Sequence, residues 1–387
     1  MKIALVAQKY PPIAGGGETH IQNLADGLSA RGYDVTVLTS DPGAEARRYR
    51  HAGVSIEYVD GFWAACQSLE CKDAVADLYA RLSGREWDLV HVFNHVPALL
   101  LSWLRAAVPQ PVCVSLFETH VPAGRVFDLW GDYALEKALQ RSLFGQLAAE
   151  RVVCGSEAYR RWALAGGAAE ERIRVVPFGT ETRRFARAGA LRAVARQARG
   201  LGGEFAVLVP ARPVRRKRIE DALRALALVR RERPGTRLML TLPDRTADSE
   251  YVGELRRLAA DLGQTDAVRW ERGPGWQDMP ELYAAADAVL LPSSHEGFGI
   301  ALIEGMAAGR PVITSDVEGH DEIVTHAETG LLYPAGDVEA LADRLRAVAS
   351  GAGVPGMVER ARELARARFD VAAMVAGHHR VYRELVG

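Results

Sequence analysis

Two carboxylates eight positions apart, Glu296 and Glu304, lie within the most informative stretch of the chain, Ser293–Thr314. The apolar run Asp287–Leu291 predicts a strand before this stretch, and Gly309-Arg310-Pro311 near its end is typical of a helix stop. We therefore expect a loop that carries Glu296, followed by a helix that carries Glu304. Because eight residues are just over two helical turns, both carboxylates can face the same side at different depths.

The start of this helix predicts an anion site between the two carboxylates. Free N–H groups at a helix start point outward and carry partial positive charge, which favours a guest such as phosphate. Carboxylates above and below the anion suggest that hydroxyl groups flank it. A nucleotide sugar has that shape.

A cationic loop follows a second predicted strand, Phe205–Val209. Five basic residues fall within the seven positions from Arg212 to Arg218. Such runs are usually solvated, but this one lies at the carboxyl end of a buried strand and before a helix, where it could clamp a diphosphate. Lys217 is the only lysine after Lys137, which is consistent either with a need for a compact ammonium or with drift.

The first residues predict a βαβ unit with a glycine-rich loop. Strand Lys2–Ala7 is followed by Gly15–Gly17, a helix from near Glu18 and strand Asp34–Leu38. The loop is too long for a dinucleotide-binding turn, and His20 replaces the last glycine of that motif, so a dehydrogenase is disfavoured. The glycines would let a ligand approach the backbone closely, or would simply make the loop flexible.

Strands and helices alternate along most of the chain, which predicts α/β domains with parallel sheets. Further strands are expected at Val54–Val59, Leu89–Phe93, Val112–Leu116, Arg151–Cys154, Arg174–Val176, Arg237–Leu242 and Ala267–Trp270. Glu181–Gly203 has no strand pattern and is expected to connect two domains.

Ligands of such sheets bind beyond the carboxyl ends of the strands, where Asn94, His95 and His120 stand. Phe369–Val386 is expected to form an amphipathic helix with Met374 and Val375 inward. The His378-His379 pair in that helix is expected at the surface.

Composition excludes several classes of function. The 387 residues are 48% hydrophobic and 25% charged, with a net charge of −1, so there is no electrostatic argument for a nucleic-acid partner. Four cysteines make no disulfide framework, the N-terminus does not read as a signal peptide, and no apolar run reaches the roughly 18 residues of a membrane span. We expect a cytoplasmic protein of two domains.

The chain resembles the GT-B-fold retaining glycosyltransferases of family 4, also called glycosyl transferases group 1. The matching elements are the E-x7-E motif Glu296–Glu304 with Gly309-Arg310-Pro311-Val312 after it, Pro11-Pro12 with the glycine triplet, the pair Arg212 and Lys217, and the strand Asp287–Pro292. The resemblance implies an N-terminal Rossmann-like acceptor domain (1–182), a donor domain (183–367) and a C-terminal helix (368–387) that packs back on the first domain. The two domains would face a cleft.

The resemblance also implies roles for individual residues. The implied catalytic residues are Arg212, Lys217, Glu296 and His120. Those that would bind the donor diphosphate are Gly16, Gly17, Arg212, Lys217 and Ile300. Those for the donor sugar are Glu296, Gly297, Phe298 and Gly299, and those for the nucleoside are Glu304, Arg272 and Gly273. The acceptor would meet Gly15, His20, Asn94, His95 and His120.

By the same resemblance, a hexose-type sugar would move from a UDP- or GDP-linked donor to a small polar or natural-product acceptor, with retention and without a cofactor or metal. The sequence shows no Asp-x-Asp pair placed for Mg²⁺, and fixed cations can stabilise the departing diphosphate. The enzyme would be a monomer or a homodimer. The alternatives are a membrane-surface enzyme for a lipid or polysaccharide acceptor, a sugar-nucleotide epimerase and a non-catalytic binding module.

The sequence departs from the family pattern at three places. Phe117 stands where many relatives have a histidine, so either His120 takes that role or the role is absent. The usual Gly-Gly-x-x-Glu appears as Glu318-Gly319-His320-Asp321-Glu322, and the usual Gly-Val-Asp appears as Gly179-Thr180-Glu181.

Overall fold

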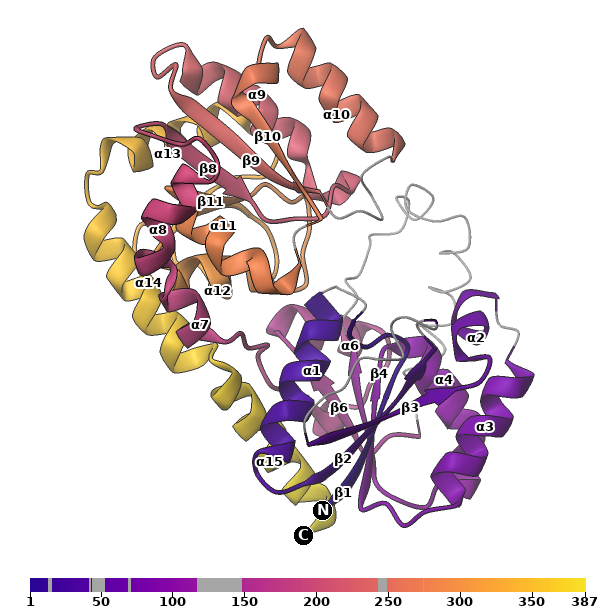
Figure 1. Cartoon of the computed structure of the whole chain (residues 1–387). Coiled ribbons are helices and arrows are strands. Elements are labelled where there is room, and N and C mark those ends of the chain that lie inside the picture. The colour runs from indigo at the N-terminus through magenta and orange to yellow at the C-terminus, as the bar shows by residue number, and fades with distance from the viewer. Residues whose placement is uncertain are drawn as a thin grey trace. The chain divides into compact units, whose positions relative to one another are not determined.

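The computed structural model describes residues 1–12, 16–41, 43, 53–68, 71–116, 148–242, 249–273 and 275–387. The chain forms two compact units (Figure 1). The first comprises Met1–Gly179 and Val371–Gly387, and the second comprises Thr180–Asp370.

The first unit is built on a seven-stranded parallel sheet with the order β3-β2-β1-β4-β5-β6-β7. Its strands are β1 (Lys2–Ala7), β2 (Asp34–Ser40), β3 (Val54–Val59), β4 (Leu89–Phe93), β5 (Val112–Leu116), β6 (Arg151–Cys154) and β7 (Ile173–Val175). Its helices are α1 (Gly16–Ser29), α2 (Phe62–Ser68), α3 (Lys72–Ser83), α4 (His95–Leu104), α6 (Glu157–Ala165) and α15 (Val371–Val386). All five residues of β4 are buried, as expected for a strand covered on both faces.

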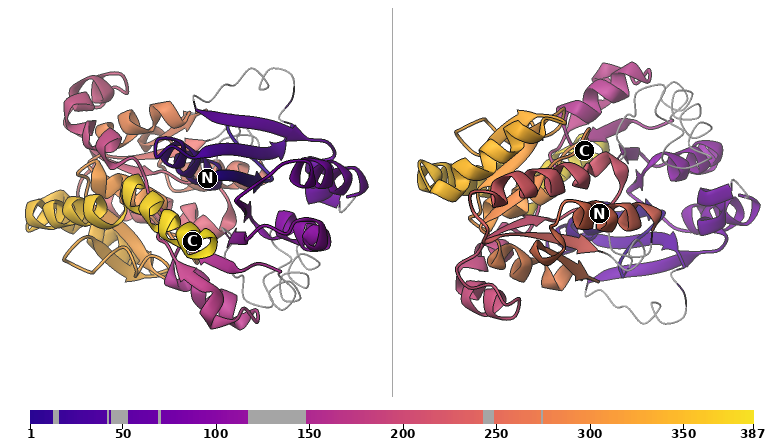
Figure 2. Two further views of the ribbon diagram at one scale, coloured as in Figure 1. Left: turned by 90° about the horizontal axis from the view of Figure 1, so that it is seen from below. Right: turned by 90° about the horizontal axis from the view of Figure 1, so that it is seen from above.

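Helix α15 returns to the first unit and lies beside α1 (Figures 1 and 2), which confirms the expected return of the C-terminal helix. Met374 and Tyr382 of α15 belong to the same core cluster as Leu24 of α1. A Cβ added at Gly27 would lie 2.3 Å from a methyl carbon of Val375, so glycine lets the two helices approach closely. The core of the first unit is therefore completed by α15, the last of the described helices.

The expectation that His378 lies at the surface is wrong, because its side chain is 1% exposed. Positions 374, 378 and 382 are four apart and share one helical face, so His378 follows Met374 and Tyr382 inward. Its Nδ1 lies 3.0 Å from the carbonyl oxygen of Met374. Its ring lies 5.7 Å from that of His20 and 5.6 Å from that of His91.

The second unit is built on a six-stranded parallel sheet with the order β10-β9-β8-β11-β12-β13. Its strands are β8 (Phe205–Val209), β9 (Thr236–Leu242), β10 (Val268–Arg272), β11 (Ala288–Leu291), β12 (Val312–Asp316) and β13 (Leu331–Pro334). Its helices are α7 (Thr182–Ala186), α8 (Ala188–Gln197), α9 (Ile219–Arg230), α10 (Glu250–Asp261), α11 (Met279–Ala285), α12 (Ile300–Ala307), α13 (Val338–Ser350) and α14 (Val354–Arg368).

Residues 181–203, expected as a connection, contain α7 and α8 and belong to the second unit. The chain passes between the units at residues 179–180 and again at 370–371. Just inside the second unit, the Thr180 N–H donates to the carbonyl of Phe369 at 2.9 Å. The second unit thus begins and ends on two paired backbone segments.

Among the described residues, no helix combines the length and the apolar character that a membrane crossing requires.

Candidate functional site

Strand order changes direction between β8 and β11 in the second sheet. From β8 the chain builds outward to β9 and β10, and from β11 it builds the other way to β12 and β13. In parallel α/β sheets the loops that follow two such strands diverge and leave room for a ligand. The cationic loop follows β8 and the Glu296 loop follows β11, so topology alone brings the two predicted donor segments together.

Glu296 is held by two cations of the neighbouring loop. The guanidinium of Arg216 donates to Glu296 Oε1 at 2.5 Å, and the ammonium of Lys217 donates to the same oxygen. Ser293 Oγ adds a third bond to this oxygen at 3.1 Å. The side chains of Glu296 and Lys217 are only 9% and 13% exposed, so water screens their attraction weakly.

Backbone and hydroxyl contacts fix this arrangement. The Ser294 N–H donates to the carbonyl of Arg216 at 2.8 Å, which ties the Glu296 loop to the cationic loop. Ser315, at the end of β12, donates from its hydroxyl to the carbonyl of Ser293 at 2.5 Å. The carboxylate is therefore held by three strand ends rather than by one mobile loop.

The charges of this cluster set its protonation. Burial alone would raise the pKa of Glu296, but Lys217 and Arg216 outweigh burial and lower that pKa well below its usual range. Burial, together with the charges of Arg216 and Arg212, lowers the pKa of Lys217 to about 8, although Glu296 opposes the shift. At neutral pH the site therefore holds an ionised carboxylate beside at least two cations.

Glu304 has a different environment, one turn inside α12. Its side chain is buried, and Tyr283 of α11 donates to Glu304 Oε2 at 2.6 Å. Burial raises the pKa of Glu304 to about 7, while the bond from Tyr283 and the charge of Arg184 lower it by less. The two carboxylates of the E-x7-E motif thus differ widely in acidity.

Replacing Glu304 with glutamine is expected to stabilise the protein at alkaline pH. A glutamate in an unfolded chain titrates near pH 4.3, so the folded state binds more protons between that pH and 7. The free energy of unfolding of the wild type therefore falls as pH rises through this window, by about 3 kcal/mol relative to a residue that does not titrate. Urea denaturation of wild type and Glu304→Gln at pH 4.5 and pH 8 measures this difference.

The exposed Glu281 of α11 supplies the control. Glu281→Gln should leave the pH dependence of stability unchanged. A Glu304→Gln variant whose stability differs from the wild type by the same amount at both pH values would show that Glu304 is ionised throughout.

The other predicted donor residues lie on the same edge of the second sheet. Gly297 and Phe298 are buried, and the Phe298 ring packs on Phe369 at 5.7 Å. Gly299 has a φ of 138°, a conformation that glycine adopts readily, and Ile300 opens α12. Arg212 follows β8 and is exposed, whereas Arg272 ends β10 and is followed by Gly273. Their contacts with a donor remain predictions.

The predicted residues of the first unit gather at the corresponding point of the other sheet, between β1 and β4. Gly16 and Gly17 form the first turn of α1, which begins two residues earlier than expected, so their N–H groups belong to a helix start. Asn94 follows β4 with a φ of 70°, and His95 opens α4. Gly15, Phe117 and His120 lie outside the described residues.

His20 is part of the core of the first unit. Its ring is 2% exposed and lies 4.7 Å from the ring of Phe178. Burial and the neighbouring His378 lower the pKa of His20, which keeps the imidazole neutral. For the predicted contact to form, an acceptor would have to reach the His20 ring, which is enclosed by the protein.

Three residues beside the predicted donor residues were not predicted from the sequence. Arg216 was seen only as one charge of a run, yet it holds Glu296. Tyr283 was hidden in an ordinary helix pattern, and its hydroxyl reaches Glu304. His320 was noted only as an unspecified position of the Gly-Gly-x-x-Glu motif, and it is fully buried next to Gly299. No signal in the sequence marks Tyr283.

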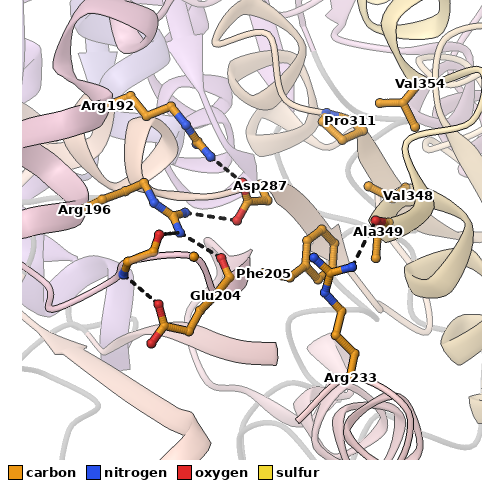
Figure 3. Close-up of a pocket in the computed structure, with 12 residues that line it drawn as sticks. Arg192, Arg196, Glu204, Phe205, Arg233, Asp287, Pro311, Val348, Ala349 and Val354 are labelled. Atoms are coloured by element: carbon orange, nitrogen blue, oxygen red, sulfur yellow. Dashed lines mark hydrogen bonds and ion pairs between the residues drawn. The ribbon is translucent and has the colours of Figure 1, made fainter. Parts of the chain in front are cut away.

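A cavity of about 550 Å³ lies at the opposite edge of the second sheet (Figure 3). It is lined by residues that include those preceding β8, β11 and β12, whereas the predicted donor residues of this unit follow β8 and β11 or lie at the end of β10. Arg196 in its wall donates to Asp287 at 3.0 Å and to the carbonyls of Gly202 and Glu204 at 2.7 Å. These arginine contacts tie α8 to the start of β11, and we assign them a structural role.

Replacing Asp287 with alanine is expected to destabilise the protein by about 3 kcal/mol, because Arg196 would keep a largely buried charge without its counter-ion. Asp287 also accepts from the Ala206 N–H at 2.8 Å and pairs with Arg192. Chemical denaturation measures the change. Asp266, a largely exposed partner of Arg230, is the matched control, and Asp266→Ala should have a much smaller effect because water screens this pair. Equal losses for the two variants would contradict the structural role of Asp287.

Two family models match the chain, one over each unit. "Glycosyltransferase Family 4" matches residues 14–184, and "Glycosyl transferases group 1" matches residues 192–368. The second match contains all of the predicted donor residues outside the first unit. Together the two models span most of the sequence.

Named relatives are similar over part or all of the chain. A D-inositol 3-phosphate glycosyltransferase of Saccharomonospora viridis is 36% identical over 223 residues, which cover 56% of this chain and 51% of that protein. A glycogen synthase of Mycobacterium tuberculosis is 27% identical over 412 residues, covering 99% and 94% of the two chains. The chain thus spans about half of the first relative and nearly all of the second.

Among solved structures, Anabaena Alr3699/HepE in complex with UDP-glucose is similar over 100% of both chains, with a TM-score of 0.84 and 22% identity. At that identity the similarity shows the fold, which is GT-B.

Proposed function

Because the chain belongs to glycosyltransferase family 4 (glycosyl transferases group 1), we propose that it moves a hexose-type sugar from a nucleotide diphosphate sugar to a hydroxyl of a small polar or natural-product acceptor. The observation that carries the proposal is the ionised Glu296 held by Lys217 and Arg216 at the strand-order reversal, with Glu304 eight residues further on. We further propose that transfer proceeds with retention at the anomeric carbon and without a metal.

The cluster of charges suggests how the donor is bound. A diphosphate that enters the site would take Lys217 and Arg216 as partners, since two negative phosphates offer these cations more than one carboxylate does. Glu296 would then turn its oxygens to hydroxyls of the sugar. Glu304 would accept hydroxyls of the ribose, and Arg212 would add a third cation to the diphosphate.

The same groups would lower the barrier of the reaction. When the glycosidic bond to phosphate breaks, negative charge grows on the leaving oxygen, and fixed buried cations stabilise it without reorganisation. In a front-face reaction the leaving phosphate takes the proton of the acceptor hydroxyl, so a general base in the protein is not required. Glu296 and Glu304 would grip hydroxyls and would not form the acid–base pair of a glycosidase.

A UDP- or GDP-linked sugar is the proposed donor. Alr3699/HepE was solved with UDP-glucose, which makes UDP-glucose the first candidate. The experiment that tests the function is incubation of the chain with UDP- or GDP-sugars and panels of acceptors, followed by measurement of nucleoside diphosphate release and of the glycosylated product. Release that requires an acceptor supports the proposal.

Two other outcomes would replace this function. Isomerisation of the nucleotide sugar without any acceptor would make the protein an epimerase. Binding of the nucleotide sugar in calorimetry, with neither turnover nor isomerisation across the panels, would make it a binding module.

A membrane-surface acceptor is a second candidate, favoured by exposed aromatic residues of the first unit. Trp63, Tyr79 and Trp103 are 37%, 49% and 56% exposed and lie on α2, α3 and α4, which contact one another. Exposed tryptophan is common where proteins meet a lipid interface. Co-sedimentation with anionic liposomes tests this candidate, and recovery of all the protein in the supernatant would rule it out.

A further inference from the structure

His320 lies beneath the Glu296–Gly299 loop, two residues after Glu318, where the sequence departs from its family pattern. A Cβ added at Gly299 would lie 3.0 Å from His320 Cδ2 and 3.3 Å from Nε2, so one edge of the imidazole faces the backbone of Gly299. The preceding residue supports the same loop. A Cβ at Gly319 would lie 2.7 Å from the carbonyl oxygen of Glu296, a contact that only glycine permits.

The hydrogen bonds of His320 define its tautomer. Thr314 donates its hydroxyl hydrogen to the carbonyl of Leu291 at 2.8 Å, so its oxygen can only accept from His320 Nδ1, which lies 2.6 Å away. The carbonyl of Ser315, 3.2 Å from Nδ1, is also an acceptor. Nδ1 therefore carries the hydrogen, and Nε2 presents a lone pair. Thr314 lies in the middle of β12, and its bond to Leu291 joins it to β11.

The other ring nitrogen shows that this histidine is not the most stable choice for the position. Nε2 is buried and has no hydrogen-bond partner among the described residues. A buried polar atom without a partner costs about 1–3 kcal/mol, which an apolar side chain of similar size would avoid. A buried group that lowers stability in this way is commonly found next to a functional site.

We propose that His320 is a positioning residue for the sugar of the donor. Its neutral imidazole, anchored to Thr314, supports Gly299 from below and holds the Glu296–Gly299 loop in the shape that grips the transferred sugar. His320 acts through the loop and not through the diphosphate. Burial lowers the pKa of His320 to about 4, so the ring remains neutral where the enzyme would work. This inference rests on the proposed function.

The proposal predicts a loss that is specific to the sugar. His320→Ala removes the support of Gly299, and a shift of the loop by about 1 Å is expected to lower kcat/KM for the donor by about 10- to 100-fold. Affinity for the nucleotide sugar should fall by about tenfold, a change of about 1.4 kcal/mol, whereas affinity for the matching nucleoside diphosphate should stay within about twofold. Titration calorimetry with UDP and UDP-glucose, and with GDP and GDP-mannose, measures both affinities.

Two further variants separate positioning from general loss of structure. In His320→Asn the amide nitrogen takes the place of Nδ1 and can still donate to Thr314, so this variant should recover most of the lost sugar affinity. His378→Ala removes an equally buried imidazole from the first unit and should lower the melting temperature while leaving the ratio of the two affinities unchanged.

The possible outcomes distinguish a failure of this inference from a failure of the proposed function. If the wild type binds neither nucleotide sugar, the proposed donor is wrong and the role of His320 falls with it. If the wild type binds one of them, and His320→Ala either leaves both affinities unchanged or weakens sugar and diphosphate equally, the inference alone is overturned. An asparagine variant as impaired as the alanine variant would also overturn it.

Discussion

Replacing Lys217 with alanine is expected to lower the rate of sugar transfer by about 10³-fold, the upper range for removing one preorganised group that stabilises developing charge. Lys217 is a buried ammonium aimed at the point where the proposed diphosphate leaves, and among the described residues its partner Glu296 would retain Arg216 and Ser293. The lost charge stabilises the transition state more than the bound substrate, so the decrease should appear in kcat. Steady-state release of nucleoside diphosphate measures it.

The same loop offers a matched control in Arg215. This arginine also carries a positive charge, but it is exposed and pairs with Glu254 at 2.7 Å. Arg215→Ala should therefore change kcat by less than about threefold, as expected for a solvated surface pair. The kcat of Lys217→Arg should lie between those of Lys217→Ala and Arg215→Ala. The positive charge remains, but the planar guanidinium does not fit the enclosed site. If Lys217→Ala retained wild-type kcat, the proposed donor site would be wrong.

Replacing Glu296 with glutamine is expected to have opposite effects on two ligands. The sugar loses an ionised acceptor, so kcat/KM for the donor should fall by about 10²- to 10³-fold, the range for one charged group that is well placed for the transition state. The nucleoside diphosphate without a sugar should bind at least as tightly as before. Its negative charges would no longer meet a carboxylate that competes for Lys217 and Arg216.

Calorimetry with the diphosphate and kinetics with the nucleotide sugar test this pair of expectations. Glu254→Gln, which neutralises the exposed partner of Arg215, is the control and should leave both quantities unchanged. A Glu296→Gln variant that binds the diphosphate more weakly by the same factor as the nucleotide sugar would show that Glu296 shapes the whole site rather than holding the sugar.

The sheets could be predicted from the sequence because their strands are short apolar runs bounded by turn residues. Val54–Val59 and Phe205–Val209 have the bounds expected for them. The meeting of the cationic loop with the Glu296 loop could also be anticipated in outline, since both follow strands of one parallel sheet. The hydrogen-bond partners of single atoms could not be predicted, because Arg216 and Lys217 contact Glu296 although about 80 residues of sequence separate them.

Burial of polar side chains was the main failure of the sequence-based view. His378 was expected at the surface because no further ligands suggested a metal site, although its spacing from Met374 and Tyr382 places it on the inward face. The contacts of His320 depend on Thr314, six residues earlier in the sequence and inside strand β12. Periodicity carries no information about which polar group a buried imidazole will meet.

The position of α15 determines the order in which the molecule can be completed during synthesis. The second unit is an insertion within the first, so the ribosome finishes residues 180–370 before it makes the helix that closes the core around Leu24 and Val37. The usual order, in which the N-terminal domain folds first, is therefore reversed for the final packing step. Until α15 is made, apolar side chains that it covers, Leu24 among them, would stay exposed although they were synthesised first. Chaperones would therefore have the longest time to bind the part of the protein that was made first.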